Sequence, residues 1–381
     1  MPDQPPLPPR VNLVVLFGGQ SAEHDVSRAT AAHVLAALDP DRYAVRAVGI
    51  SRDGAWVEAD DAAIAAVRAL RDGAAGVGPA IASGVAVVGR PTVPTAALAG
   101  DFAGTAVTGT ADAGAAPTVV LPLLHGPLGE DGTVQGLLEL ADVAYVGAGV
   151  LGSAVAMDKA MAKTVLAAHG IPQARWCTVF EHEIHPGTAE ELADDLGLPL
   201  FVKPANMGSS VGVTKAKSVD DVERAIATAL TYDSVVVVEE AIVGREIEVA
   251  VLGNTAPKAS VAGEIVPGHE FYDFDDKYVD GGAKLLIPAP LSETDAAIVR
   301  RLAVDTFRAL RGDGLARVDF FFEEGGRGFL CNEANTMPGF TPISMYPKLW
   351  QATGLSYPEL LDELVRLALD RHARRRRNTA R

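Results

Sequence analysis

Few cysteines and no long apolar run occur in this 381-residue sequence. The two cysteines, Cys177 and Cys331, lie far apart, so they form neither a disulfide framework nor a CxxC zinc pair, and reduced thiols are expected. The first residues, MPDQPPLPPR, lack the apolar segment of a signal peptide. No apolar run is long enough to span a bilayer. These absences predict a cytoplasmic protein with no membrane partner.

Basic residues are too few to balance the acids. Lys and Arg total 33 against 49 Asp and Glu, which gives a formal net charge of -16. Repulsion by phosphates opposes non-specific nucleic-acid binding by such a chain, so no nucleic-acid partner is expected. An anionic ligand must be held by local Lys, Arg and backbone N–H groups. The composition, 48% hydrophobic and 22% charged, is that of a globular protein, and the length predicts two or three domains.

The first part of the chain has the pattern of a doubly wound α/β domain, expected at residues 11–150. A proline-rich tail at 1–10, expected to be disordered, precedes an apolar run at Val11–Phe17 that predicts a buried strand. Gly18-Gly19 and a helix to about Leu38 follow, with Ser21 as the expected N-cap. Further strands are predicted at Val45–Ile50 and Thr118–Leu124, and a helix at Thr133–Leu140. Residues 55–116 carry little pattern.

Beyond residue 150 the predicted strands follow one another with little helix between them, which indicates antiparallel sheets and an α+β arrangement. A central domain is expected at 151–240 and a C-terminal domain at 241–372, before a basic, solvated tail at 373–381. Helices are predicted at about Met157–Gly170, at Val219–Leu230, from Leu291, and at Tyr357–His372. The predicted strands are Leu200–Pro204, Val211–Thr214, Val235–Glu239, Glu246–Leu252, Ala316–Phe322 and Gly328–Asn332.

Two predicted strands near the end of the chain carry a candidate metal site. Asp319 lies on the first, and Glu333 and Asn335 follow on the next. Alternate residues of a strand share a face, so Glu333 and Asn335 point the same way. If Asp319 lies beside them, two carboxylates and an amide oxygen form a set that suits Mg²⁺ bound to phosphates. The alternative is an ordinary strand end with solvated acids.

Two lysines are candidates for binding phosphate. Lys203 ends an apolar strand, where a lysine needs a partner, and the small-residue segment Gly208–Gly212 follows. Small residues let backbone N–H groups approach an anion closely, although the segment does not match the P-loop pattern and a tight hairpin is the alternative. Lys159 begins a helix, where a cation opposes the helix dipole unless it binds an anion. An exposed surface lysine would also explain it.

Two further segments carry polar groups at places where a ligand could bind. Glu239-Glu240 ends the run Val235–Val238, and Glu246 follows on the next strand. Backbone groups at such a strand end can contact an adenine edge, and a carboxylate can bind ribose hydroxyls; charges that merely mark a strand end are the alternative. The aromatic and charged stretch Phe271–Tyr278, flanked by glycines, is typical of a lid. An ordinary surface loop is the alternative.

Taken in order, these segments resemble the D-alanine–D-alanine ligase family of the ATP-grasp superfamily. The matching segments are LFGGQSAEHDVS, LHGPLGEDGTVQG, YVGAGVLGSAVAMDK, FVKPANMGSSVGV, VVVVEEAIVGREIEVAVLG, FYDFDDKY, ARVDFFF and LCNEANTMPGFTPIS. No single segment is decisive, but all of them in this order are specific. The resemblance implies an α/β N-terminal domain followed by α+β ATP-grasp domains, with ATP bound between the last two domains.

The resemblance also implies a role for each matching residue. Lys159 and Lys203 correspond to phosphate-binding lysines, Glu239, Glu240 and Glu246 to adenine and ribose contacts, and Asp319, Glu333 and Asn335 to the ligands of two Mg²⁺ (or Mn²⁺) ions. Arg317 and the Gly339 amide correspond to donors to the tetrahedral intermediate, and Glu23 and His125 to groups beside the first D-alanine. Ser209, Lys277 and Tyr278 correspond to the set that closes over ATP and the second substrate, and Ser344 and Met345 to the positions that hold the product carboxylate.

The activity implied is the ATP-dependent joining of two D-alanine molecules through an acyl phosphate, for peptidoglycan precursor synthesis, by an enzyme that forms a homodimer. A sister ligase that makes D-alanyl-D-lactate or D-alanyl-D-serine is the nearest alternative. The pair Lys277-Tyr278 resembles the dipeptide-forming members, because lactate-forming members have a histidine in that role. An inactive nucleotide-binding protein is less consistent with Lys203, Asp319, Glu333 and Asn335. Another ATP-grasp ligase, such as a biotin carboxylase, is not supported by GGQSAEHD.

Overall fold

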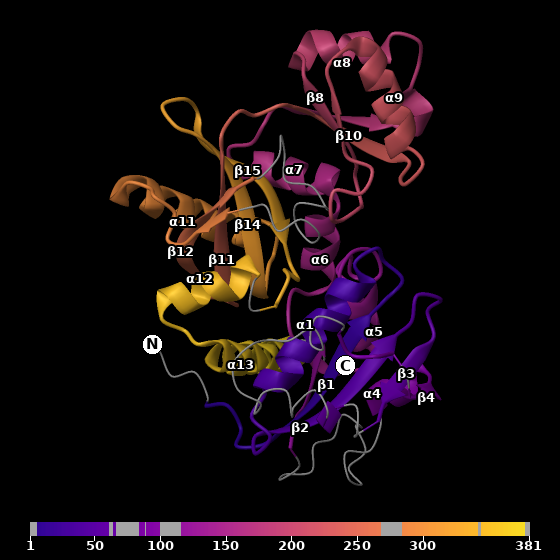
Figure 1. Cartoon of the computed structure of the whole chain (residues 1–381), viewed down its shortest axis with the longest axis vertical. Coiled ribbons are helices and arrows are strands. Elements are labelled where there is room, and N and C mark those ends of the chain that lie inside the picture. The colour runs from indigo at the N-terminus through magenta and orange to yellow at the C-terminus, as the bar shows by residue number, and fades with distance from the viewer. Residues whose placement is uncertain are drawn as a thin grey trace.

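The computed structural model describes residues 6–60, 64–65, 84–87, 89–99, 116–267, 284–341 and 344–377. Within these residues the strands form three sheets, with six, four and five strands. Figure 1 shows the first sheet at the bottom, the third at the upper left and the second at the upper right. No helix in the described ranges is long and apolar enough to cross a membrane.

The first sheet is built on β1 (Val11–Gly18), which is buried along its whole length. It lies parallel to β2 (Tyr43–Ile50) and β5 (Thr118–Pro122), as the apolar runs predict. The sheet order is β4-β3-β2-β1-β5-β6. Its other elements are α1 (His24–Ala37), β3 (Trp56–Ala59), β4 (Gly89–Thr92), α4 (Pro94–Ala99), α5 (Thr133–Leu140) and β6 (Ala144–Tyr145). The expected N-cap at Ser21 is wrong: α1 begins at His24, and Ser21 Oγ instead accepts from the Glu23 N–H at 3.3 Å.

The second sheet is antiparallel, in the order β7-β10-β8-β9. Its strands are β7 (Trp176–Phe180), β8 (Leu200–Pro204), β9 (Thr214–Ala216) and β10 (Val235–Glu240). Helices α8 (Thr188–Leu196) and α9 (Val219–Ala229) pack on one face, and a short 3-10 turn (Glu181–Glu183) follows β7. The predicted strand at 211–214 is mostly wrong, because Ser209, Ser210 and Gly212 have positive φ and turn the chain before β9 begins.

The third sheet is also antiparallel, in the order β13-β12-β11-β14-β15. Its strands are β11 (Arg245–Gly253), β12 (Lys258–Val266), β13 (Lys284–Leu286), β14 (Gly314–Glu323) and β15 (Gly328–Asn335). Helices α6 (Val150–Met157), α7 (Lys159–Ala168) and α11 (Glu293–Ala309) pack on one side of it. Helices α12 (Met345–Thr353) and α13 (Tyr357–Arg376) lie between it and the first sheet, and side chains of all four elements form one continuous core.

The helix predicted at about Met157–Gly170 is α7, which begins at Lys159 after the N-cap Asp158, whose side chain accepts from the Met161 N–H at 2.9 Å. Helix α6, which precedes it, was not predicted. The basic run near the C-terminus is not a solvated tail: α13 continues to Arg376. Arg374 pairs with Asp313, just before β14. Arg375 pairs with Glu139 of α5, and Arg376 with Asp142 after that helix.

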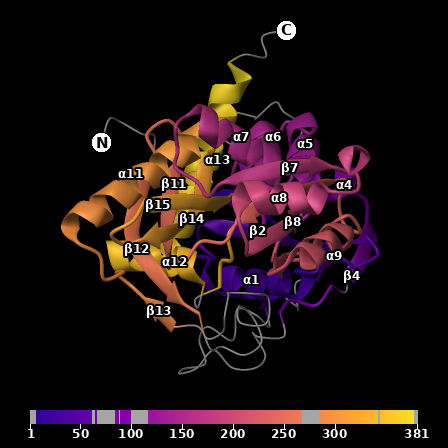
Figure 2. The same cartoon turned by 90° about the horizontal axis from the view of Figure 1, so that it is seen from above.

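Helix α7 contacts both the second and the third sheet. Leu166 packs into the core of the third sheet. At the other end of the helix, Ala160 packs with Val237 of β10, on the face of the second sheet that α8 and α9 do not cover. Figure 2 shows α7 from above, beside both sets of strands. Polar residues near the start of α7 therefore lie at the junction of the two sheets.

Candidate active site

Strands β14 and β15 bring four polar side chains onto one face. Asp319 pairs with Glu333, and Arg317 with Asn335, in an antiparallel register. Directly opposed residues and residues two apart share a face of a sheet. On the other side of β14, Glu248 of β11 is opposite Asp319, so it lies on this face too. The strand register thus places Asp319 on the same face as Glu333 and Asn335, the arrangement that the candidate metal site requires.

The Arg317 guanidinium is held by two carboxylates. Its Nε and Nη2 donate to Asp319 at 2.8 and 2.7 Å, and its Nε lies 3.0 Å from Glu248 Oε2. Burial opposes the charged form, but Asp319 and Glu248 outweigh it and raise the pKa of Arg317 well above its ordinary value. Arg317 is therefore a charged donor whose plane is fixed before any ligand binds.

Asn335 lies between the two predicted metal-binding carboxylates. Its amide nitrogen is 3.0 Å from Asp319 Oδ2 and 3.4 Å from Glu333 Oε1. A half-turn of the amide would put its oxygen at the same place. Within the described ranges, no three His, Cys, Asp or Glu side chains gather as metal ligands, so the amide oxygen is needed to complete the set. Two carboxylates and an amide oxygen fit the oxygen ligands that Mg²⁺ prefers.

Glu239 is clamped between two lysines. Lys203 Nζ lies 3.0 Å from Glu239 Oε2, and Lys163 Nζ lies 3.2 Å from Glu239 Oε1. Lys163 and Glu239 are each only 3% exposed. Burial alone would raise the pKa of Glu239, but the two lysines overcome it and lower the pKa to about 2. Lys163 was not among the predicted site residues; its spacing of four from Lys159, on one helix face, was the available signal.

Lys159 lies at the start of α7, near the same cluster. Its Nζ donates to the Met207 carbonyl, just before the small-residue segment. Burial, with the charge of Lys203 added, lowers the pKa of Lys159, while Glu333, Glu239 and Glu130 oppose the shift. The predicted phosphate lysines and the predicted metal-binding acid Glu333 are therefore near neighbours in space.

The loop after β5 adds two buried groups. His125 Nδ1 is 3.0 Å from the Met337 carbonyl oxygen, which can only accept, so this nitrogen carries the proton. His125 Nε2 is buried and has no hydrogen-bond partner in the described structure. Glu130, which was not predicted, accepts from the Gly126 N–H at 2.8 Å. Burial and the nearby charge of Glu23 raise the pKa of Glu130 to about 8.

A cleft of about 220 Å³ joins Glu23 to the small-residue segment. It is lined by Gln20, Ser21, Ala22, Glu23, Pro127, Leu128, Met207, Gly208, Ser209 and Val211. A Cβ at Gly208 would lie 3.2 Å from Glu23 Oε2, so glycine lets the segment approach this carboxylate closely. The structure thus brings the predicted residues Glu23 and Ser209 to one cleft.

Other predicted residues are placed differently. The Glu240 carboxylate accepts from the Arg175 N–H, just before β7, and from Arg327 in the turn between β14 and β15, both at 2.6 Å, so these contacts occupy its side chain. Glu246 lies at the start of β11, opposite Phe321 of β14. Lys277 and Tyr278, with the predicted lid at 271–278, lie outside the described residues.

The residues predicted at the product carboxylate lie where α12 begins. Ser344 is the N-cap residue of α12, and its Oγ accepts from the Thr341 N–H at 3.1 Å. A Cβ at Gly339 would lie 3.0 Å from this Oγ, so the two predicted positions are adjacent. The Met345 side chain is buried in the main core; only its main chain is available to a ligand.

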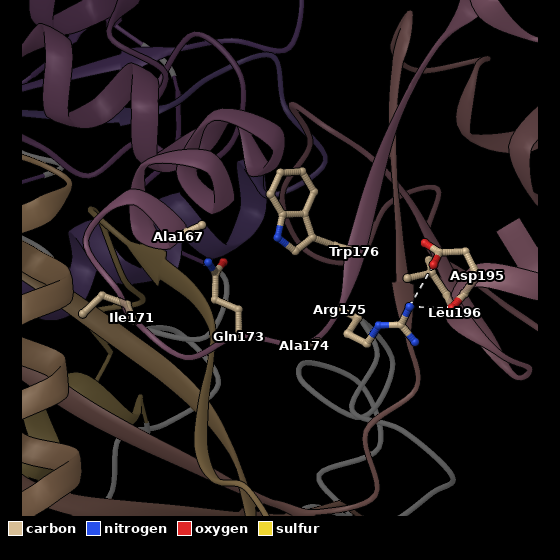
Figure 3. A pocket seen from close by; sticks show the side chains of 8 residues that line it. All are labelled: Ala167, Ile171, Gln173, Ala174, Arg175, Trp176, Asp195 and Leu196. Atoms are coloured by element: carbon tan, nitrogen blue, oxygen red, sulfur yellow. Dashed lines mark hydrogen bonds and ion pairs between the residues drawn. The ribbon is translucent and has the colours of Figure 1, made fainter.

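A larger, open cavity lies away from these groups. Its volume is about 350 Å³, and Figure 3 shows the side chains around it, with the Arg175–Asp195 ion pair at one end and Trp176 beside α7. It is lined by Ala167, Ile171, Gln173, Ala174, Arg175, Trp176, Asp195 and Leu196. None of the lysines or acids described above lines it, so its size does not mark the reactive site.

Comparisons with known proteins agree with this arrangement. Residues 12–148 match the family model for the D-ala D-ala ligase N-terminus, and residues 165–366 match the model for the C-terminus. The chain is 47% identical over 375 residues to a D-alanine–D-alanine ligase of Kineococcus radiotolerans, covering 95% of this chain and 98% of that protein. It is 45% identical over 369 residues to a ligase of the same name from Bacillus cytotoxicus, covering 95% of this chain and 97% of that one.

Solved structures give the same result. The D-alanine–D-alanine ligase of Coxiella burnetii superposes with a TM-score of 0.78 at 36% identity, over 97% of both chains. The VanG D-Ala:D-Ser ligase of Enterococcus faecalis superposes with a TM-score of 0.76 at 31% identity, over 94% of this chain and 99% of that one. The predicted fold class, an α/β domain followed by α+β ATP-grasp domains, is confirmed. The chain belongs to the D-alanine–D-alanine ligase family.

Proposed function

We propose that this chain joins two D-alanine molecules into D-alanyl-D-alanine and converts ATP to ADP and phosphate. The observation that carries the proposal is that the predicted phosphate lysines, the predicted metal-binding face and the Glu23 cleft are neighbours. Lys159 lies near Lys203 and Glu333, and Glu130 lies near both Glu333 and Glu23. In this reaction a carboxylate attacks the γ-phosphate of ATP, ADP leaves, and an acyl phosphate forms. The amine of the second D-alanine then attacks the acyl carbon, and phosphate leaves.

Lys159 and Lys203 are proposed to hold the phosphates of ATP. Both lie at the start of the small-residue segment, where their charges are close to one another. The carboxylates of Glu239 and Glu240 are held by the two lysines and by Arg175 and Arg327, so their main chains would contact the adenine. The Glu246 carboxylate would hold the ribose. Mg²⁺ (or Mn²⁺) would be held by Asp319, Glu333 and Asn335 and would supply positive charge to the transferring phosphoryl group.

The first D-alanine is proposed to bind beside Glu23 and His125. The buried Glu23 carboxylate faces the cleft that Ser209 also lines, and a carboxylate there can hold an ammonium group. Because the Met337 carbonyl fixes the proton of His125 on Nδ1, the buried Nε2 offers a lone pair while the imidazole is neutral. That lone pair is a suitable acceptor for a substrate N–H.

Arg317 and the Gly339 N–H are proposed to stabilise the oxyanion that forms when the amine attacks. The guanidinium is already charged and fixed by Asp319, so it needs little reorganisation during the reaction. Ser344 and the main chain of Met345 would hold the carboxylate of the second D-alanine at the start of α12. Ser209, Lys277 and Tyr278 would close over ATP and this substrate and keep water from the acyl phosphate.

The remaining expectations are proposals of the same kind. The three sheets would belong to three domains, expected at residues 11–150, 151–240 and 241–372, although α7 packs into the cores of both the second and the third sheet. The enzyme would act in the cytoplasm as a homodimer, supplying the dipeptide for peptidoglycan and so for cell-wall growth and cell shape. No nucleic-acid or membrane partner is proposed.

A phosphate-release assay tests the function directly. The purified chain is given ATP and MgCl₂ with D-alanine, with D-alanine plus D-lactate, or with D-alanine plus D-serine, and the products are separated by chromatography. We expect release that needs D-alanine and stops with EDTA, and D-alanyl-D-alanine as the main product in every mixture. Release without D-alanine would contradict the proposal, and a mainly D-lactate or D-serine product would place the chain with the sister ligases.

A further inference from the structure

The buried lysine of α7, Lys163, has no place in the chemistry described so far. It is 3% exposed, and its ammonium makes no hydrogen bond in the described structure. A buried lysine is unfavourable unless a charge compensates it. Its ion pair with Glu239, at 3.2 Å, supplies that charge. Burial of the Lys163 ammonium is unfavourable, so we looked for a function that its charge could serve.

The geometry of the second sheet shows how the Lys163 charge affects Lys203. Glu239 on β10 lies opposite Phe201 on β8, and Lys203 is two residues further along β8. Lys203 and Glu239 are therefore diagonal neighbours on one face, and their side chains meet at 3.0 Å. Lys163 reaches the other oxygen of the same carboxylate from α7. One carboxylate thus fixes two ammonium groups that come from different elements.

The charge of the cluster depends on Lys163. Lys203 and Glu239 alone would form a neutral pair, which offers little attraction to a phosphate. With Lys163 the three side chains carry a net charge of about +1, and in a buried site such a charge is poorly screened. The carboxylate can then hold Lys203 in place without cancelling the charge of the cluster.

We propose that Lys163 is a positioning residue for ATP: by sharing Glu239, it keeps Lys203 both fixed and effectively cationic toward the nucleotide phosphates. This inference rests on the proposed function, in which Lys203 contacts those phosphates. Lys163 itself does not touch ATP in this arrangement; it acts through Glu239 and Lys203.

The test uses Lys163→Met, Lys163→Arg, Glu239→Gln and the double variant Lys163→Met/Glu239→Gln, with Lys217→Met, an exposed lysine before α9, as the matched control. Two readouts are taken: the KM values for ATP and for D-alanine, and the Kd of ATP without metal by calorimetry. We expect Lys163→Met to raise both the KM and the Kd for ATP about tenfold, the factor that about 1.4 kcal/mol gives. The KM for D-alanine should change less than threefold, and Lys163→Arg should recover most of the loss.

The double variant separates positioning from simple destabilisation. Once Glu239 is neutral, Lys163 has no shared carboxylate through which to act, so the double variant should bind ATP within about threefold of Glu239→Gln alone. A double variant that binds ATP about tenfold more weakly than Glu239→Gln would overturn the inference, as would Lys163→Met that binds ATP normally. If the wild-type chain shows no D-alanine-dependent phosphate release, the proposed function fails instead; the calorimetric comparison among the variants still decides the role of Lys163 in binding ATP.

Discussion

Replacing Arg317 with lysine should show how much of the reaction depends on a planar, prepositioned cation. In the structure the guanidinium uses Nε and Nη2 for Asp319, at 2.8 and 2.7 Å, and Nε also faces Glu248 at 3.0 Å. A lysine has one nitrogen on a flexible stem, so it cannot hold both carboxylates and still present a donor in a fixed direction. Arg317→Lys therefore keeps the positive charge but loses the planar donor group that the two carboxylates hold in a fixed direction.

The size of the effect follows from what the donor does. Loss of one preorganised donor to an oxyanion lowers turnover by roughly 10²- to 10³-fold, or about 2.7–4 kcal/mol. Because the side chain is 17% exposed, solvent does not screen its ion pairs strongly. We therefore expect turnover to fall at least about 10²-fold with a smaller change in the KM for ATP. The loss of stability should be below the roughly 3–5 kcal/mol that removing the charge of a buried pair costs.

The assay is phosphate release at saturating ATP and D-alanine, together with thermal unfolding to verify the fold. Arg300→Lys is the matched control: Arg300 is exposed on α11 and donates to the Ala259 carbonyl at 3.0 Å, away from the site. It should keep wild-type turnover. If Arg317→Lys affected only the KM for ATP, Arg317 would belong to nucleotide binding, and the assignment to the oxyanion would be refuted.

Three further predictions follow from the structure, and one, for Tyr278, follows from the sequence. Glu333→Gln should lose most activity at limiting Mg²⁺ while it keeps the wild-type melting temperature, because an amide binds Mg²⁺ more weakly than a carboxylate; normal turnover there would remove Glu333 from the metal site. Arg371→Met removes the contacts of a buried guanidinium with the partly exposed Glu139 and Asp313, which keep Arg375 and Arg374 as partners; it should lower the free energy of unfolding in urea by about 1.5–3 kcal/mol, more than an exposed control such as Arg301→Met. Because folding raises the pKa of Glu130 from its ordinary 4.5 to about 8, the folded, unliganded chain holds a proton that the unfolded chain releases. Stability from this group is therefore present below pH 4.5 and lost as pH rises toward 8, and Glu130→Gln should flatten that fall; an unchanged slope would contradict the shift. Tyr278→His should raise the share of D-alanyl-D-lactate in mixed substrates, more at pH 6 than at pH 8, because a protonated imidazole attracts the lactate carboxylate; equal product ratios at both pH values would argue against the lid as the determinant of the acceptor.

The strands could be predicted because their apolar runs are local signals. The buried strand at 11–17, the antiparallel strands at 200–204 and 235–239, and the helix Thr133–Leu140 all lie where the sequence places them. The misses have tertiary causes. Helix α13 extends to Arg376 because its arginines pair with acids that lie far away in the sequence.

Some residues of the candidate site could be predicted from the sequence, and others are evident only from the structure. That Glu333 and Asn335 share a face follows from strand periodicity, whereas it is the strand register that places Asp319 opposite Glu333. Lys163 and Glu130 could not be found from spacing alone. Lys163 matters because β10 brings Glu239 to it, and Glu130 matters because the loop after β5 folds beside Glu23. The role of each depends on a neighbour in another element.

An acidic protein can bind an anionic substrate if its site holds a few cations in fixed positions. The chain carries a net charge of -16, yet the site concentrates Lys159, Lys163, Lys203 and Arg317. Glu239 is shared between two lysines, so the group Lys163–Glu239–Lys203 keeps a net charge of about +1. At Arg317, by contrast, two carboxylates hold one guanidinium. The local positive charge therefore lies at the lysines. Because these pairs are buried, salt screens them less than it would screen a surface patch. The attraction for ATP therefore comes from a few fixed groups and not from the overall charge, which repels it.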